Sequence, residues 1–198
     1  YSDVIPTAGE QVWDDSDTDD NGIPLHENDN MVGYNGTFGN VGVSLAYVNG
    51  GNGSTGGAAS DSSWVITYDG LMDGLTLGLG QGENGETQDL QTMYAKYTSG
   101  ALTVGYQISD VDNTGSTADE EAIGIGASFA VNDNLSVSAG RHEVDMGAGK
   151  VDETSTGFSA SYTSGGVTIG FVANSTEDVA GTAGSDDSYR EVSVSFAF

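Results

Sequence analysis

Apolar and polar residues alternate along most of the chain after residue 30. In residues 41–47, VGVSLAY, the odd positions are apolar and the even positions are Gly, Ser and Ala. Successive side chains of a strand point to opposite faces, so this pattern predicts a β-strand with two unlike faces. The alternation recurs at 64–68, 75–79, 102–109, 123–129, 135–139, 158–162, 167–171 and 192–198, with weaker segments near 30–38 and 89–98. Together these segments predict about eleven strands, each near the ~9–11 residues with which a tilted strand spans a bilayer.

The connections between these strands alternate in length. Short turns are expected at 38–40, 70–74, 99–101, 131–134 and 164–166. Longer acidic loops are expected near 49–61, 82–88, 110–118, 145–152 and 174–187. A short turn at every second connection predicts an up-and-down antiparallel meander with all its tight turns at one end. Bacterial transmembrane barrels have this asymmetry.

The two faces of the predicted strands differ in the size of their side chains. One face carries aliphatic and aromatic residues, and the other carries Gly, Ser, Thr, Ala and Gln with few charges. A soluble β-sandwich or adhesin, the alternative fold, would bury its apolar faces on each other and expose charged residues on the opposite face. Bulk on one face and small polar residues on the other instead suit lipid outside and water inside. The sequence therefore predicts an all-β, transmembrane, antiparallel up-and-down β-barrel.

The composition excludes several classes of function. The chain has 30 acidic and 4 basic residues, a formal net charge of −26 and no cysteine. Nucleic-acid phosphates would be repelled, so no nucleic-acid partner is expected. The only histidines are His26 and His142, and no G-x-S-x-G elbow occurs, so no catalytic constellation stands out. We predict a protein that is not an enzyme and requires no cofactor.

The number of predicted strands is odd. The first strand, near 30–38, and the last, 192–198, both run from the loop end to the short-turn end. Closed single-chain bacterial barrels have an even number of strands. We therefore expect an odd number of further strands before Tyr1, and five would bring the total to about sixteen.

A family resemblance rests on the segment DDNGIPLHEND, the Gly-rich alternating hairpins and the terminal Phe198. These features resemble the alphaproteobacterial general diffusion porins, which are sixteen-stranded trimeric proteins of the Gram-negative outer membrane. The resemblance implies that residues 1–29 are a constriction loop folded into the barrel. It implies that residues 30–198 are the hairpins of strands six to sixteen, the C-terminal two thirds of such a porin. It further implies a homotrimer, contact with outer-membrane lipid, passage of small hydrophilic solutes and ions, and Phe198 as the assembly signal.

Carboxylates of the predicted constriction loop would dominate the electric field of the pore. The predicted wall is nearly neutral, with Lys96 and His142 as its clearest basic residues. Acids in a narrow passage attract cations and reject anions, so we predict a passive, weakly cation-selective diffusion pore. The predicted constriction residues are Asp14, Asp15, Asp17, Asp19, Asp20, Glu27 and Asp29.

The same segment partly matches a calcium-binding loop. Asp17, Asp19, Asn21 and Gly22 fit the opening D-x-[DN]-x-[DN]-G. The twelfth position of the loop, where an acid is expected, is Asn28, and the acid Glu27 stands one residue early. Two interpretations stay open, a solvated acidic loop or a bound Ca²⁺, and the alternative function is an acidic Ca²⁺-binding surface or adhesion domain. The candidate Ca²⁺ ligands are Asp15, Asp17, Asp19, Asn21 and Glu27.

Two arginines fall on the lipid-facing phase of their strands. Arg141 and Arg190 both lie near the loop ends, where an arginine costs only about 0–1 kcal/mol. They either contact lipopolysaccharide phosphates through charge-assisted hydrogen bonds or extend to the headgroups without a specific partner.

Overall fold

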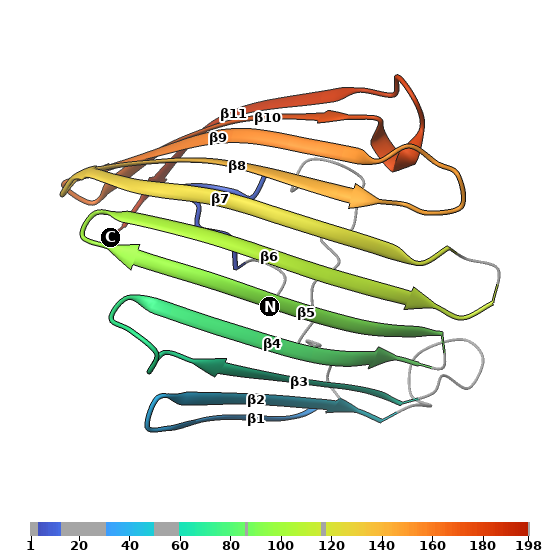
Figure 1. The fold of residues 1–198 in the computed structure, drawn as a ribbon. Coiled ribbons are helices and arrows are strands. Elements are labelled where there is room, and N and C mark those ends of the chain that lie inside the picture. The colour runs from blue at the N-terminus through green and yellow to red at the C-terminus, as the bar shows by residue number, and fades with distance from the viewer. Residues whose placement is uncertain (1–3, 13–30, 50–59, 86, 116–117, 198) are drawn as a thin grey trace.

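The strands follow one another along almost the whole chain. The computed structural model describes residues 4–12, 31–49, 60–85, 87–115 and 118–197. These residues form the strands β1 (Met31–Phe38), β2 (Val41–Val48), β3 (Asp61–Tyr68), β4 (Leu75–Asn84), β5 (Gln88–Ser99), β6 (Leu102–Asn113), β7 (Glu120–Asn132), β8 (Leu135–Asp145), β9 (Glu153–Ser164), β10 (Val167–Glu177) and β11 (Asp187–Phe196), with a 3-10 helix η1 (Val179–Gly181) between the last two (Figure 1).

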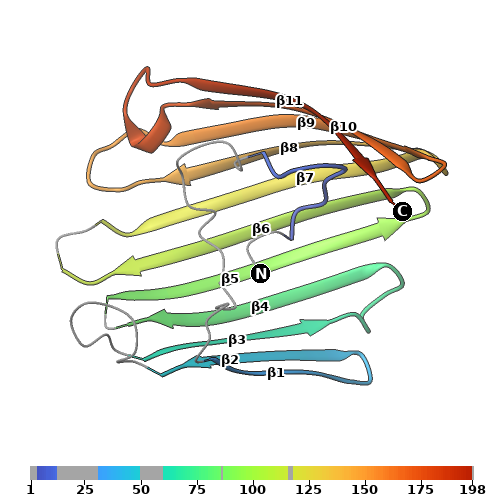
Figure 2. The same cartoon turned by 180° about the vertical axis from the view of Figure 1, so that it is seen from behind.

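All eleven strands belong to one antiparallel sheet in the order β1 to β11, so each strand pairs with its neighbours in sequence. This arrangement confirms the predicted all-β, up-and-down meander. The sheet is open within the described residues, since β1 pairs only with β2 and β11 only with β10. Figures 1 and 2 show the β9–β11 end of the sheet curling over. Among all the residues that the structure describes, no helix is long and apolar enough to cross a membrane.

The connections alternate in length as predicted, with one exception. β4 ends at Asn84 and β5 begins at Gln88, so the longer loop expected near 82–88 is shorter than the connection between β3 and β4. β1 and β2, β5 and β6, and β9 and β10 are joined by turns of two residues, and glycines with positive φ stand in them, among them Gly39 (φ 64°) and Gly100 (φ 59°). A side chain is strained at such angles, which explains why the sequence places glycine there. The short turns lie together at the left of Figure 1, and the long connections lie at the right.

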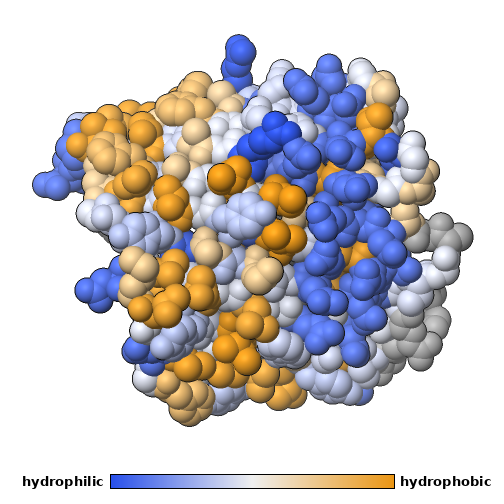
Figure 3. Space-filling model, in the orientation of Figure 1, coloured by the Kyte–Doolittle hydropathy of each residue, from blue (hydrophilic) through white to orange (hydrophobic). Residues whose placement is uncertain are grey.

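The outward face of the sheet, the face seen in Figure 3, is divided into two bands. Toward the short turns it is apolar, with exposed Leu102, Phe129 and Phe171, and toward the long loops it is hydrophilic. The strands β5 to β10 have 11 to 13 residues, longer than predicted, and their loop-side ends carry the acids. At the loop-side ends of β4 to β10, the acidic side chains that point outward are Glu83, Asp89, Asp110, Asp112, Glu121, Glu143, Asp145 and Glu177.

The opposite, inward face is built largely of small polar residues. Ser138 and Ser159 hydrogen-bond across β8 and β9 at 2.6 Å, and Ser155 and Thr176 across β9 and β10 at 2.8 Å. The prediction that this face carries only small residues was incomplete. It also holds a buried apolar cluster of Val65, Leu90 and Val111, in which large side chains stand over the glycines of β4.

Candidate pore-lining face

Four glycines lie side by side across the inward face. The strand register pairs Gly105 of β6 with Gly126 of β7, Gly126 with Gly140 of β8, and Gly140 with Gly157 of β9. We call these four residues the glycine row. Because successive strands contribute one glycine each, the row leaves a stretch of inward face without side chains.

Residues 4–12, which we call the inner segment, lie on this row (blue in Figure 2). A β-carbon on Gly126 would stand 2.5 Å from Cγ2 of Ile5, and one on Gly105 would stand 2.5 Å from Cδ of Pro6. A β-carbon on Gly157 would stand 2.8 Å from Cγ1 of Val12. Ile5 and Val12 are only 4% and 8% exposed. The close contact of segment and sheet therefore depends on glycine.

Hydrogen bonds fix the inner segment at two further points. The amide of Ala8 donates to Oγ of Ser138 at 2.9 Å. At the other end, Nδ2 of Asn174 donates to the carbonyl of Gln11 at 3.0 Å. Within the segment, Nε2 of Gln11 donates to the carbonyl of Ile5 at 2.9 Å. These bonds satisfy backbone groups that would otherwise be buried without partners.

The inner segment and the strands beside it border an open cavity of about 540 Å³. Lys96 of β5, together with Thr98 and Thr103, lines one side of it, and Glu10 of the inner segment lines another. A lysine and a carboxylate thus line the same cavity between the segment and the sheet. His142, the second basic residue expected on the wall, does lie on the inward phase of β8 but is buried.

The inward face is acidic, not nearly neutral as the sequence suggested. Of the four Lys and Arg residues, only Lys96 is on the inward phase of a described strand, since Arg141 and Arg190 point outward and Lys150 lies in a loop. The acids were missed because each stands at the loop-side end of its strand, outside the alternating segment from which that strand was predicted. The inward phase carries Asp61, Glu120, Glu153, Asp187 and Glu191.

Glu153 holds the loop between β10 and β11, at the end of the sheet where the long connections lie. Its side chain is 1% exposed, and its Oε2 accepts the amide of Ala180 in η1 at 2.7 Å. Asp178 and Ala180 both have positive φ, 57° and 55°, so the connection between β10 and β11 is held in a strained conformation. Glu153 therefore ties this loop to the start of β9.

Most of the predicted site residues lie outside the described residues. This holds for Asp14, Asp15, Asp17, Asp19, Asp20, Asn21, Glu27, Asp29 and Phe198. Their roles in a constriction, a Ca²⁺ site and assembly stay predictions, as does the division at residues 29 and 30. Within the described residues, no group of three or more His, Cys, Asp and Glu side chains is arranged to hold a metal ion.

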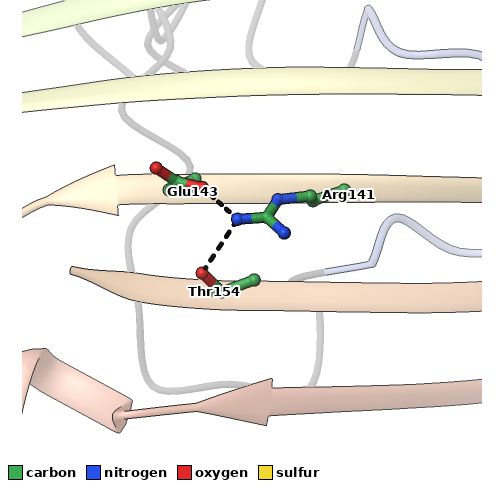
Figure 4. A network of polar contacts seen from close by, with 3 residues as sticks. All are labelled: Arg141, Glu143 and Thr154. Atoms are coloured by element: carbon green, nitrogen blue, oxygen red, sulfur yellow. Dashed lines mark hydrogen bonds and ion pairs between the residues drawn. The ribbon is translucent and has the colours of Figure 1, made fainter.

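The two predicted lipid-facing arginines do lie on the outward phase. Arg190 stands opposite Ala173, and Arg141 stands between Ile125 and Thr156. Nη2 of Arg141 forms an ion pair with Glu143 and a 3.5 Å hydrogen bond with Oγ1 of Thr154 (Figure 4). The contact with lipopolysaccharide stays a prediction.

The glycine row was not found by sequence analysis. Each glycine is unremarkable in its own strand, because the alternation places Gly at many inward positions. The row exists only once the register of four strands is known, and no single stretch of the sequence specifies that register.

Comparison with solved structures identifies relatives of this fold. OccK3 (OpdO) of Pseudomonas aeruginosa superposes with a TM-score of 0.68 at 16% identity, over 85% of this chain and 58% of that chain. An anion-selective porin from Comamonas acidovorans gives a TM-score of 0.70 at 16% identity, over 85% and 59%. A porin structure refined at 1.8 Å resolution gives 0.71 at 21% identity, over 98% and 72%. The chain thus spans a little under three fifths of the length of the first two proteins.

No curated protein matches the sequence. A family model described as Gram-negative porin matches residues 3–198, which is nearly all of the chain. Family and fold agree with the meander, the apolar outward band and the polar inward face described above. The chain therefore belongs to the Gram-negative porins, a family of outer-membrane β-barrel channel proteins.

Proposed function

We propose that the protein is a passive diffusion pore for small hydrophilic solutes and ions, with a weak preference for cations. The observation that carries the proposal is the charge of the inward face, where the carboxylates outnumber the single lysine, Lys96. In a water-filled passage through a low-dielectric wall, an excess of carboxylates raises the local concentration of cations. Glu153 is 1% exposed and accepts the amide of Ala180, so the accessible acids of the loop-side rim are the ones that meet ions directly.

The finer features belong to the same proposal. We infer a homotrimer of the general diffusion type, with residues 1–29 narrowing the lumen, from the resemblance of the sequence to alphaproteobacterial porins. The inner segment on the glycine row supports an inward course for this region. The Comamonas acidovorans porin is anion-selective, but at 16% identity it is a guide to fold only, so the charges of this chain decide the sign of the selectivity.

Reversal potentials in planar bilayers across a KCl gradient test the selectivity. We expect the protein to favour K⁺ over Cl⁻. The pair Asp187→Asn and Glu191→Gln, which point inward on β11, should reduce that preference. The pair Asp110→Asn and Asp112→Asn is the matched control, because it removes equal charge from the outward face. Anion preference of the unmodified protein, or an equal effect of both pairs, would refute the proposal.

A further inference from the structure

Lys96 lies in an uncharged part of the inward face. Among the described residues of β4, β5 and β6, it is the one charged side chain that points inward, and all the acids of these strands point outward. Toward the short turns its inward neighbours are the hydroxyls of Thr76, Thr98 and Thr103. The ammonium group of Lys96 therefore stands among neutral polar groups of the wall.

The ammonium of Lys96 is available to a solute. Its Nζ forms no ion pair and no hydrogen bond with a described residue. The side chain is partly exposed and lines the open cavity of about 540 Å³ together with Thr98 and Thr103. The hydroxyls of Thr98 and Thr103 bond to each other at 3.1 Å. Since this bond uses only one of their two protons, the other proton stays available as a donor.

The glycine row brings a carboxylate to the other side of this cavity. Lys96 lies directly opposite Gly105 in the register of β5 and β6, so its partner on β6 has no side chain that could separate it from the inner segment. Pro6 of that segment rests on Gly105, with Cδ 2.5 Å from the place of a β-carbon. Glu10 of the same segment is exposed and lines the cavity.

A tight turn of the inner segment holds Glu10 in place. Oγ1 of Thr7 donates to the carbonyl of Glu10 at 2.8 Å, and the amide of Gly9 donates to Oγ1 of Thr7 at 3.1 Å. The amide of Ala8, within this turn, is bound to Oγ of Ser138 on the sheet. Glu10 and Lys96 form no ion pair with each other in the part of the chain that the structure describes. Two opposite charges thus line one cavity without neutralising each other.

We propose that Lys96 and Glu10 form a binding subsite for small zwitterionic solutes, which carry one carboxylate and one ammonium group, as amino acids do. This inference rests on the proposed diffusion pore and names a class of solute for it. The carboxylate of the solute accepts hydrogen bonds from Nζ of Lys96 and from the free hydroxyl proton of the Thr98–Thr103 pair. Its ammonium donates to the carboxylate of Glu10. Hydrogen bonds between charged groups are about twice as strong as those between neutral groups.

The surrounding charges favour a zwitterion over a simple ion. A phosphate would be attracted by Lys96, but it would be repelled by Glu10 and by the acids of the loop-side rim, among them Glu120 and Asp187. A simple amine would be attracted by Glu10 and repelled by Lys96. A zwitterion places each of its charges beside the opposite one and has no net charge for the rim to repel. Because the cavity is open to water, salt screens these charges within about 8 Å, so binding should weaken as ionic strength rises.

Uptake into proteoliposomes at low ionic strength tests the subsite. The probes are glycine, β-alanine and 4-aminobutyrate, which differ in the separation of their charges, and the neutral acetamide, propionamide and butyramide. Propionate, propylamine and inorganic phosphate represent the simple ions. We expect uptake of at least one zwitterion to saturate with concentration, because the subsite retains it, and uptake of the amides to rise linearly. Lys96→Gln should raise the half-saturation concentration at least about tenfold, since hydrogen bonds to a charged group are lost.

Variants of matched charge serve as controls. Lys150→Gln removes the same charge from a loop, and Asp112→Asn removes an acid from the outward face, so both should leave saturation unchanged. Lys96→Glu or Glu10→Lys alone should abolish saturation. The two together should restore it, because the solute then binds in the reverse orientation.

The neutral amides separate the subsite from the pore. Absence of amide uptake would refute the proposed diffusion pore. If the amides pass, the subsite alone would be refuted by linear uptake of all three zwitterions, by tighter retention of phosphate or propionate, or by undiminished saturation in Lys96→Gln.

Discussion

Replacing Gly126 with alanine should detach the inner segment from the sheet. The added β-carbon would stand 2.5 Å from Cγ2 of Ile5, closer than side-chain β-carbons are found in proteins. The strand itself should tolerate the change, because alanine in a strand interior is favoured over glycine by about 0.5–1 kcal/mol. The strain therefore falls on Ile5, which must leave its 4% exposed position.

The size of the effect follows from what the segment loses. Exposing a buried isoleucine costs about 1.5–3 kcal/mol. The hydrogen bonds from Ala8 to Ser138 and from Asn174 to Gln11 contribute about 0.5–1.5 kcal/mol each. Losing the isoleucine contact alone shifts the equilibrium between bound and detached segment by roughly ten- to a hundredfold. The detached segment should then be measurably populated while the sheet stays folded.

Hydrogen exchange at the amide of Ala8, followed by mass spectrometry, measures this detachment. We expect faster exchange in Gly126→Ala and a higher single-channel conductance. Gly82→Ala is the control, because a β-carbon on Gly82 would meet its nearest neighbour at an ordinary 3.4 Å. Combining Gly126→Ala with Ile5→Ala should restore part of the protection, since the smaller side chain makes room. Equal exchange and conductance in Gly126→Ala and Gly82→Ala would refute the contact between segment and sheet.

Three further substitutions test other parts of the structure. Glu153→Leu should speed exchange of the Ala180 amide about tenfold or more, because the hydrogen bond to a buried carboxylate is lost, whereas Glu153→Gln should keep it slow. Lys96→Gln should increase the K⁺ preference in reversal-potential measurements, and a shift toward Cl⁻ would contradict its place on the inward face. Thr92→Val should lower the free energy of unfolding by about 1–3 kcal/mol, because it removes the hydroxyl that lies 2.9 Å from the buried Ser109 hydroxyl. Urea titrations followed by gel migration measure this change, and unchanged stability would count against the hydrogen bond between Thr92 and Ser109.

The fold could be predicted because its signals are local. Alternation with a period of two marks each strand, and glycines such as Gly39 and Gly100 mark the tight turns. The strand ends were harder to place. Beyond the apolar band, strands such as β6 continue through Asp110 and Asp112, and acidic residues in sequence resemble a loop. This error also hid the inward acids of the rim, on which the proposed selectivity rests.

The candidate sites, in contrast, depend on contacts between distant parts of the chain. The glycine row depends on the register of neighbouring strands. The role of Glu153 depends on the position of η1, whose Ala180 amide it accepts. Hydrophobic periodicity specifies which face a residue occupies but not which residue stands opposite. The sequence could therefore predict which face of the sheet Lys96 and Arg141 occupy, but not which residues stand beside them.

The glycine row makes the sheet one backbone thick where the inner segment lies on it. Gly126 and Ala127 are consecutive residues of β7, and the alternation of a strand puts their side chains on opposite faces. Gly126→Ala disturbs Ile5 inside the sheet, whereas Ala127→Phe adds its ring on the outward face. The first change should therefore alter single-channel conductance, and the second should leave it unchanged. An equal change of conductance in both variants would contradict the separate faces of these two neighbours.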